Sequence, residues 1–296
     1  MLFDWSMTTT MLQLMRLALR PSGGLYGMRE GCHQRHGESR YDGVLMATRN
    51  LIVTADDVGL DRGMTEGAIR AHREGIVTAC SVVANGREFA DAVARLRDVP
   101  SLEVGVHLAL VEERALTTGE AMPRDYVRFV LSRPRNIEPE LRAQIEKVLA
   151  TGLRVTHLNG HQHLHMLPRV RQVVERLARE YGIGYVRVVN DRGGRARRVS
   201  MAILNSLSRA KRGINLMTIG VAEAGHLNRT ERMIELLDHV DGLTELVTHP
   251  GVGVSGYAHW DYEWEAETRA LCDPRLREAI AARGIQLVGP SQATSC

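Results

Sequence analysis

Histidines gather in one short stretch of this chain, from Thr156 to Pro168. Four of the twelve histidines in the sequence lie there: His157, His161, His163 and His165. The stretch follows a strand-like run at 153–156 and ends at Pro168, a residue well suited to the first turn of a helix. The histidines therefore lie where a strand gives way to a helix, the edge at which α/β proteins bind ligands. Because neutral imidazole is the commonest metal ligand near neutral pH, the pattern is typical of a metal site.

The spacing of these histidines gives a first geometric expectation. Alternate residues of a strand point to the same side, so His161, His163 and His165 would share a face if strand geometry continued. The alternative is a polar loop with one or two histidines packed inside, which better explains a histidine that stands alone. Polar residues at other strand ends favour metal binding for this cluster.

The elements that must position these residues alternate regularly along the chain. Short apolar runs predict about eight strands, at residues 51–55, 79–83, 102–110, 153–156, 185–189, 216–219, 244–248 and 285–288. Helical periodicity falls between most of them, at 62–74 with Asp61 as N-cap, 87–97, 141–149, after Pro168, 230–238 and 273–283. Residues 112–139 predict a long loop with one short helix. This alternation implies a parallel sheet, and we expect a TIM-like (β/α) barrel, regular or distorted, with a doubly wound open sheet as the alternative.

Further polar residues stand at the ends of other predicted strands. Asp56 and Asp57 end the first strand, His107 lies late in the third, and His249 ends the seventh. In a barrel these positions converge with the histidine stretch at the carboxyl-terminal mouth. Two histidines and one carboxylate form a standard set for a divalent ion. Zn²⁺ suits them best by softness, and Mg²⁺, Mn²⁺ and Co²⁺ are also admitted.

The adjacent aspartates are expected to differ in role. Successive strand residues face opposite ways, so one carboxylate can bind a metal while the other stays free as a base. Each residue also has a simpler explanation: a turn or helix cap for the aspartates, a core position for His107, and a turn for His249. Their convergence at several strand ends favours a site.

Four ordered motifs resemble those of the YdjC-like carbohydrate deacetylases, the ChbG/HpnK family. They are Thr54-Ala55-Asp56-Asp57-Val58-Gly59-Leu60, Gly105-Val106-His107-Leu108, the run from His157 to His165, and Thr248-His249-Pro250-Gly251. The similarity runs from about Leu51 to Val288. It implies a (β/α)-barrel-like fold and the divalent-metal-dependent removal of N-acetyl groups from sugars.

The resemblance also implies roles for individual residues. Asp57, His107 and His161 would bind the metal, Asp56 would be the general base, and His249 would protonate the leaving amine. His163 and His165 match positions near the substrate. Two departures are that Val58 stands where the family usually has Phe, and Asn159 where many members have Asp. The second weakens the expectation that residue 159 orients a ligand, and the Asn-Gly-His form looks more like the hopanoid-associated HpnK branch.

The composition limits which classes of partner and which cellular location are expected. The chain has 296 residues and a net charge of +3, and nothing global suggests a nucleic-acid partner. Four scattered cysteines fit a reducing, cytoplasmic location. No apolar run approaches the roughly 18 residues that span a bilayer. Residues 1–48 predict a poorly ordered N-terminal extension, followed by one barrel-like domain over 49–296. A homodimer is compatible with the sequence.

Two stretches could concern the substrate. Residues 257–264 hold two of the three tryptophans, and Trp260 could pack on a sugar ring, although packing of the loop against the barrel explains it as well. Residues 192–212 carry seven basic side chains and no acid. They could touch an anionic inner-membrane surface or a phosphate, as a lipid-linked sugar substrate would require, or form a solvated face.

The leading hypothesis is a metal-dependent hydrolase that removes an acetyl group from an amino sugar. Metal-assisted hydrolysis of another bond, such as a phosphoester, and a non-catalytic metal- or sugar-binding protein remain as alternatives. A binding protein would need the ligands but neither Asp56 nor His249, so their presence favours an enzyme.

Overall fold

The computed structural model describes residues 49–132, 134, 137–189 and 216–294. The predicted extension at 1–48 and the whole basic run at 192–212 lie outside these residues. The strands form one eight-stranded parallel sheet: β1 (Arg49–Val58), β2 (Ala79–Val82), β3 (Glu103–Leu108), β4 (Val155–Gly160), β5 (Tyr185–Val186), β6 (Leu216–Ile219), β7 (Leu243–Thr248) and β8 (Ile285–Leu287). Each predicted strand is present, although β5 is shorter than expected and β1 runs further, through both aspartates.

The sheet curves into a barrel-like α/β fold. Its strand order is β5-β4-β3-β2-β1-β7-β6, with β8 paired to the start of β1. In a flat sheet, β5 and β7 would lie about 24 Å apart, since strand spacing is about 4.8 Å. Yet the Tyr185 hydroxyl in β5 donates a hydrogen bond to Glu245 in β7 at 2.7 Å. The prediction of a distorted barrel is therefore confirmed, and the open doubly wound sheet is excluded.

The barrel is joined differently on its last side. Within the described ranges, no backbone ladder connects β5 to β6. Instead the Thr218 hydroxyl of β6 donates to the Val188 carbonyl just after β5, at 2.7 Å. The curvature thus brings the two ends of the strand order together, although backbone hydrogen bonds between the described strands do not complete the ring.

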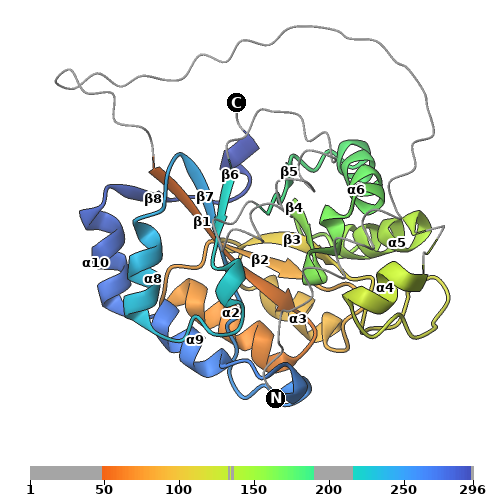
Figure 1. The fold of residues 1–296 in the computed structure, drawn as a ribbon, viewed down its shortest axis with the longest axis horizontal. Coiled ribbons are helices and arrows are strands. Elements are labelled where there is room, and N and C mark those ends of the chain that lie inside the picture. Colours follow the sequence, from red (N-terminus) through yellow and green to blue (C-terminus); the bar gives the residue numbers. More distant parts are fainter. Residues whose placement is uncertain (1–48, 133, 135–136, 190–215, 295–296) are drawn as a thin grey trace, which may run out of the picture. The chain divides into compact units, whose positions relative to one another are not determined.

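Helices cover the outer side of the sheet, with α8 and α10 at one end and α4, α5 and α6 at the other (Figure 1). They are α2 (Arg62–Arg73), α3 (Phe89–Leu96), α4 (Tyr126–Ser132), α5 (Glu138–Leu149), α6 (Pro168–Glu180), α8 (Thr230–Leu237), α9 (Trp264–Leu271) and α10 (Pro274–Ala282). Asp61 caps α2, and Pro168 opens α6, as predicted. Helix α9 was not predicted, because its sequence follows directly on the aromatic stretch.

Among the described residues, short 3₁₀ helices occur at four further places. They are η1 (His161–Met166), η2 (Val221–Glu223), η3 (Ala258–Trp260) and η4 (Gln292–Thr294). The first lies directly between β4 and α6 and contains the histidines of the predicted cluster. Strand geometry therefore stops at Gly160, before that cluster begins.

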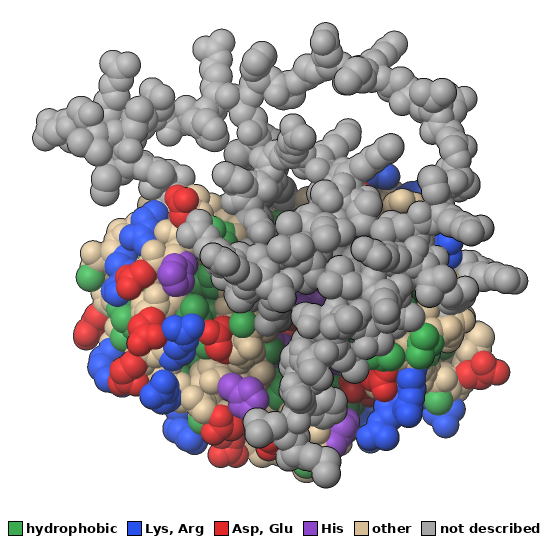
Figure 2. Space-filling view, in the orientation of Figure 1, with side chains coloured by type: hydrophobic (Ala, Val, Ile, Leu, Met, Phe, Trp, Pro, Cys, Tyr) green, Lys and Arg blue, Asp and Glu red, His purple; other side chains and the backbone are tan. Residues whose placement is uncertain are grey.

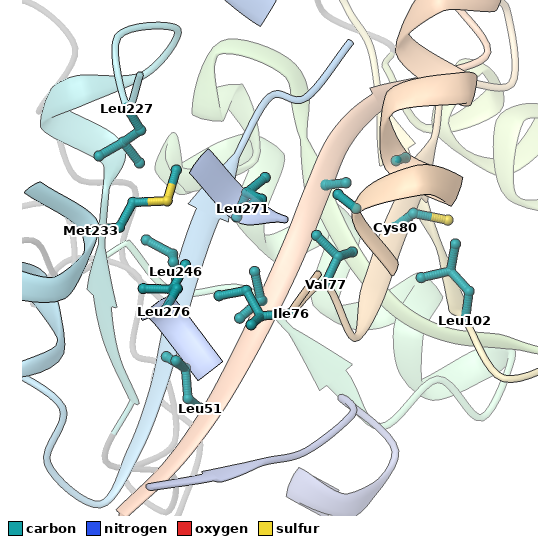
Figure 3. Close-up of a cluster of buried hydrophobic side chains, with 14 of the residues drawn as sticks. Leu51, Ile76, Val77, Cys80, Leu102, Leu227, Met233, Leu246, Leu271 and Leu276 are labelled. Carbon is teal, nitrogen blue, oxygen red and sulfur yellow. The ribbon is translucent and has the colours of Figure 1, made fainter. Parts of the chain in front are cut away.

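Strand β1 shows how the core is divided into two sides. Leu51, Val53 and Ala55 belong to the buried cluster between the sheet and its helices, part of which Figure 3 shows with Leu246, Leu271 and Leu276. The alternate residues Ile52 and Thr54 belong to the inner side, where Thr54 donates a hydrogen bond to Glu245. The inner side thus becomes polar toward the carboxyl end of the strand, which prepares a polar site at the mouth.

The described surface mixes charges of both signs. On the face drawn in Figure 2, basic and acidic side chains are interspersed wherever described residues are visible. Arg275 of α10 pairs with Glu231 of α8 at 2.8 Å, and Arg283 pairs with Asp238 at 2.9 Å. No helix in the described part of the chain is long and apolar enough to cross a membrane.

Candidate active site

The polar residues predicted at the strand ends do meet in space. Asp57 Oδ1 lies 3.2 Å from His107 Nε2 and 2.9 Å from His161 Nδ1. The three side chains are buried, and one donor atom from each lies within 4.8 Å of the other two. Asp57 lies near the end of β1, His107 lies near the end of β3, and His161 directly follows β4. The curvature of the sheet brings these three strand ends together. We call this group of side chains the donor triad.

Asp57 reaches the triad through an unusual backbone. By strand alternation, Asp56 and Asp57 should face opposite ways, and this expectation is wrong. Asp57 has a φ of 65°, and the register of β1 against β2 shifts between Ala55 and Val58. A left-handed residue reverses the alternation at that point. Both carboxylates consequently approach one ring, with Asp56 Oδ1 3.8 Å from His107 Nδ1.

The charges within the triad stabilise one another. Burial alone would raise the pKa of Asp57, but the adjacent His161 and His107 rings hold it well below the usual value. Burial likewise disfavours a charged His161, but the carboxylate of Asp57 outweighs it and raises the pKa of His161 to about 10. A carboxylate oxygen beside two imidazole nitrogens is a donor set that fits a divalent ion. Binding such an ion would displace the proton on His161 Nδ1, the nitrogen beside Asp57.

Asn159 in β4 fixes the orientation of the His107 ring. His107 Nδ1–H donates to Asn159 Oδ1 at 2.7 Å, which leaves Nε2 directed at Asp57. The Asn159 amide in turn donates to Asp56 Oδ1 at 3.0 Å and to the Ser81 hydroxyl at 2.7 Å. An amide oxygen accepts this hydrogen bond as a carboxylate would. Asn in place of Asp therefore does not remove the orienting role, contrary to the sequence-based expectation.

Asp56 is held by an arginine, Arg187, that was not among the site residues predicted from the sequence. Arg187, directly after β5, makes a two-pronged ion pair with Asp56, with Nη2 2.9 Å from Oδ1. Its Nη2 also lies 2.8 Å from Glu245 Oε1 in β7. Arg187 is 0% exposed, so three charges lie buried together. Burial would raise the pKa of Asp56, but Arg187 holds it well below the usual range, and Asp56 is therefore a carboxylate.

His249, directly after β7, lies at the edge of the triad. Its Nε2 is 4.0 Å from Asp57 Oδ2, and its ring meets Tyr262 edge-on at 5.4 Å. Its backbone N–H donates to Glu267 of α9 at 2.7 Å. Burial lowers the pKa of His249 and raises that of Glu267 to about 8. The unpredicted helix α9 thus supports a predicted site residue.

The other histidines of the cluster do not share a face with His161, and that prediction is wrong. Gln162 and His163 have left-handed φ values of 49° and 55°, which turn the chain into η1. His165 Nε2 lies 3.2 Å from the Arg187 carbonyl oxygen, and the rings of His163 and His165 meet edge-on at 6.1 Å. Burial lowers the pKa of His163 to about 3, so its ring is neutral.

His157 also lies apart from the triad, deeper in the barrel. Its Nε2 lies 3.2 Å from the Ser81 hydroxyl, and its Nδ1 lies 3.0 Å from the Thr156 hydroxyl. Burial lowers the pKa of His157 to about 4, which keeps the ring neutral. Only His161 of the four clustered histidines joins the donor triad.

Two loops close the outer side of the triad. Trp260 of η3 stacks on His161, with ring centroids 5.3 Å apart and planes 29° apart. Trp260 Nε1–H donates to Glu112 Oε1 at 3.2 Å, and Glu112 Oε2 lies 2.9 Å from His161 Nε2. The next residue, Glu113, accepts a hydrogen bond from the Tyr257 hydroxyl at 2.7 Å. Trp260 was among the residues predicted from the sequence, whereas the two glutamates were not, since both stand in a stretch without periodicity.

The geometry defines a class: an α/β-barrel protein with a buried donor triad at the carboxyl ends of its strands. The model of the YdjC-like protein family matches residues 50–282. The chain belongs to this family. The sequence-based resemblance is thereby confirmed at the level of the family.

Individual proteins agree with this placement. The chain is 31% identical over 255 residues to a carbohydrate deacetylase of Geobacillus stearothermophilus, covering 81% of this chain and 96% of that protein. It is 38% identical over 141 residues to one of Brevibacillus brevis, covering 45% of this chain and 57% of that protein. In fold it resembles a putative cellobiose-phosphate cleavage protein of Enterococcus faecalis V583, with a TM-score of 0.68 and 22% identity, over 84% of this chain and all of that one.

Proposed function

We propose that this protein is a divalent-metal-dependent hydrolase that removes the N-acetyl group from an acetylated amino sugar. Its relatives in Geobacillus stearothermophilus and Brevibacillus brevis are named carbohydrate deacetylases. The observation that carries the proposal is a second carboxylate and a further imidazole beside the donor triad. Asp56 Oδ1 lies 3.8 Å from His107, and His249 Nε2 lies 4.0 Å from Asp57. A protein that only bound a metal would need neither.

Asp57, His107 and His161 would hold the metal. When bound, a divalent ion supplies a Lewis acid that lowers the pKa of water and stabilises negative charge on an acyl oxygen. The donor set leaves coordination positions for water and substrate, as catalytic sites require. Zn²⁺ suits these donors best, and Mg²⁺, Mn²⁺ and Co²⁺ are the other ions to test.

Asp56 and His249 would move the protons. Asp56 accepts the proton of the attacking water, and Arg187 keeps its carboxylate ionised so that it can do so. The Oδ1 atom already accepts from Arg187 and Asn159, whereas among the described residues Oδ2 accepts only from Arg187, so Oδ2 has a lone pair left for this proton. His249 in its protonated form gives its proton to the departing nitrogen, and the products are acetate and a free amine.

Substrate contacts and surroundings are finer parts of the proposal. His163, His165 and Trp260 would line the space for the sugar. The sugar is an oligosaccharide or a lipid-linked one such as an N-acetylglucosaminyl hopanoid. The latter would fit peripheral contact of a cytoplasmic protein, acting alone or as a homodimer, with the inner membrane surface.

The test is acetate release from N-acetylated sugars by metal-stripped protein, with Zn²⁺, Mg²⁺, Mn²⁺ or Co²⁺ restored one at a time. Three substrates are tested. Chitobiose and an N-acetylglucosaminyl lipid test acetate release, and a phosphorylated sugar tests phosphate release. Asp56→Asn should lower turnover by about 10²–10⁴-fold, as expected for loss of a general base, and should still bind metal.

A companion variant separates catalysis from folding. Asp56→Asn also weakens the buried pair with Arg187, whereas no ring hydrogen bond of His249 supports the fold among the described residues. His249→Gln should therefore lose turnover and unfold at the same temperature as the parent. Tight metal binding without acetate release from any sugar would contradict the proposal. Phosphate release from the third substrate would instead support phosphoester hydrolysis.

A further inference from the structure

Glu112 occupies a strained and well-anchored position beside the donor triad. It follows β3 in the loop that leads to α4, and its φ is 69°, a left-handed value that non-glycine residues rarely adopt. Its backbone N–H donates to the Pro123 carbonyl at 2.9 Å, and an antiparallel bridge joins Arg114 to Ala121 just beyond. The loop therefore holds the Glu112 backbone in place. Such strain is often found where a side chain must be aimed at a site.

The Glu112 carboxylate accepts from two ring N–H groups at once. Oε2 lies 2.9 Å from His161 Nε2, and Oε1 lies 3.2 Å from Trp260 Nε1. A carboxylate can only accept, so the Trp260 indole N–H donates to Oε1 and the His161 Nε2–H donates to Oε2. Because Glu112 holds the Nε2 proton, Nδ1, which lies 2.9 Å from Asp57, is the nitrogen of His161 that can give up its proton to a metal. One side chain thus selects which nitrogen of His161 is available to a metal.

Trp260 holds the same ring from another direction. Its indole stacks on His161 with centroids 5.3 Å apart, while its N–H is bonded to Glu112. Tyr257 packs on Trp260 at 4.7 Å, so the two aromatic rings and the imidazole form one packed unit. A displacement of Glu112 would release both the ligand ring and the aromatic segment around it.

We propose that Glu112 is a positioning residue that fixes His161 with Nδ1 as its metal-binding atom and couples metal binding to the segment around Trp260. The inference rests on the proposed metal centre at the donor triad. Carboxylate partners on the far nitrogen of metal-binding histidines set the tautomer and ring orientation, and losing one typically costs about 10–100-fold in metal affinity. Glu112 does not touch the reacting groups itself.

Glu113 provides a matched control. It is adjacent in sequence, has the same chemistry and also accepts a hydrogen bond from an aromatic residue of the same loop, Tyr257. Unlike Glu112, it contacts no member of the donor triad in the described structure. Any effect of a lost charge or of a loosened loop should therefore appear in both variants. An effect on the metal ligand should appear in Glu112→Gln alone.

The first experiment measures Zn²⁺ and Co²⁺ affinity by competition with a chelator in the full chain. Glutamine offers one acceptor oxygen and places an N–H₂ group against the second ring donor, so Glu112→Gln cannot satisfy both rings. We expect its affinity to fall by about 10–100-fold, with Glu113→Gln within about threefold of the parent. Glu112→Asp withdraws the carboxylate by one methylene, so its metal affinity should also be lower than that of the parent.

The second experiment identifies the binding atom. Long-range ¹H–¹⁵N spectra of histidine-labelled, Zn²⁺-loaded protein should show His161 protonated at Nε2 and bound through Nδ1. Metal binding should also change the emission of Trp260 in the parent, measured against Trp260→Phe, and change it less in Glu112→Gln.

The outcomes distinguish this inference from the proposed function. A parent protein that binds none of the ions would overturn the metal centre itself. A parent that binds tightly, with Glu112→Gln and Glu113→Gln both unchanged, would overturn the role of Glu112 and leave the metal centre standing. Zinc on Nε2 of His161 would likewise contradict the inference.

Discussion

The two histidines of the donor triad are supported in different ways. His107 lies on β3 and is held from inside the barrel by the Asn159 amide, which connects it to Asp56 and Arg187. His161 lies beyond the end of β4 and is held from outside by Glu112 and Trp260, which come from two loops. The inner support is part of the core of the fold, whereas the outer support is added at its mouth.

This difference separates stability from function. Removing a residue of the inner support leaves buried charged or polar groups without partners. It should therefore lower both the free energy of unfolding and the metal affinity. Removing a member of the outer support leaves the strands intact and should affect mainly the site. Loops at the mouth of a barrel can therefore change while the scaffold stays folded, as is common for binding residues.

The largest effect is expected from Arg187→Met. This change leaves Asp56 and Glu245 buried without their counter-charge, and breaking a buried pair in this way costs about 3–5 kcal/mol. Urea denaturation should show the loss, with Arg283→Met as the control, because Arg283 pairs with Asp238 on the surface at 2.9 Å. The control should lose less than about 1 kcal/mol. Equal losses in the two variants would mean that the inner support does not stabilise the fold more than a surface ion pair does.

A pH dependence should show that the buried Glu267 of α9, which supports the His249 backbone, keeps its proton in the folded protein. Its pKa is raised from 4.5 to about 8 by burial, so between about pH 5 and pH 8 the folded state holds a proton that the unfolded chain releases. The free energy of unfolding should fall as the pH rises through this window, by up to about 1.4 kcal/mol per pH unit.

The measurement compares Glu267→Gln with the parent by urea denaturation at several pH values. Glutamine carries no titrating proton, so the stability difference in favour of the variant should grow from about pH 5 to pH 8 and then level off. Other titrating groups largely cancel in this difference. A difference that stays constant with pH would show that Glu267 does not hold its proton in the folded protein.

Asn159→Ala should distinguish the inner support from the outer one directly. It removes the acceptor of His107 Nδ1–H and the donor to Asp56, so we expect a loss of about 1–3 kcal/mol in unfolding free energy together with weaker Zn²⁺ binding. Glu112→Gln should weaken metal binding with little change in stability. If Asn159→Ala were as stable as the parent, the contrast between the two supports would fail.

The smallest effect on folding is expected from Trp260→Phe. Phenylalanine keeps a ring over His161 but cannot donate to Glu112, so the unfolding free energy should change by less than about 1 kcal/mol. If Trp260 also lines the sugar site, KM for chitobiose should rise while metal affinity stays within about threefold of the parent. A large loss of stability would move Trp260 from the outer support to the core.

Much of the scaffold could be predicted because its signals are local. The β-branched run of β1 and the apolar face of α6 repeat within a few residues, and this periodicity is enough to place strands, helices and their alternation. Polar residues at strand ends, such as His107 and His249, could be placed at the mouth once a barrel was assumed. The family motifs added the same residues by resemblance.

The remaining features depend on contacts between distant parts of the chain or on single backbone angles. The positive φ of Asp57 turns its carboxylate toward the triad, and that of His163 ends the alternation that would have aligned three histidines. A periodic sequence pattern cannot predict that a single residue adopts a left-handed conformation.

The sequence by itself determined the alternating elements, the family and the residue types available for a metal site. The tertiary structure decided which of those residues meet. Arg187 reaches Asp56 across 131 positions of the chain, and His161 reaches Glu112 across 49, because the curvature of the sheet and the two loops at its mouth place them together. Such pairings are set by the path of the whole backbone, whereas helix and strand patterns are set by neighbouring residues.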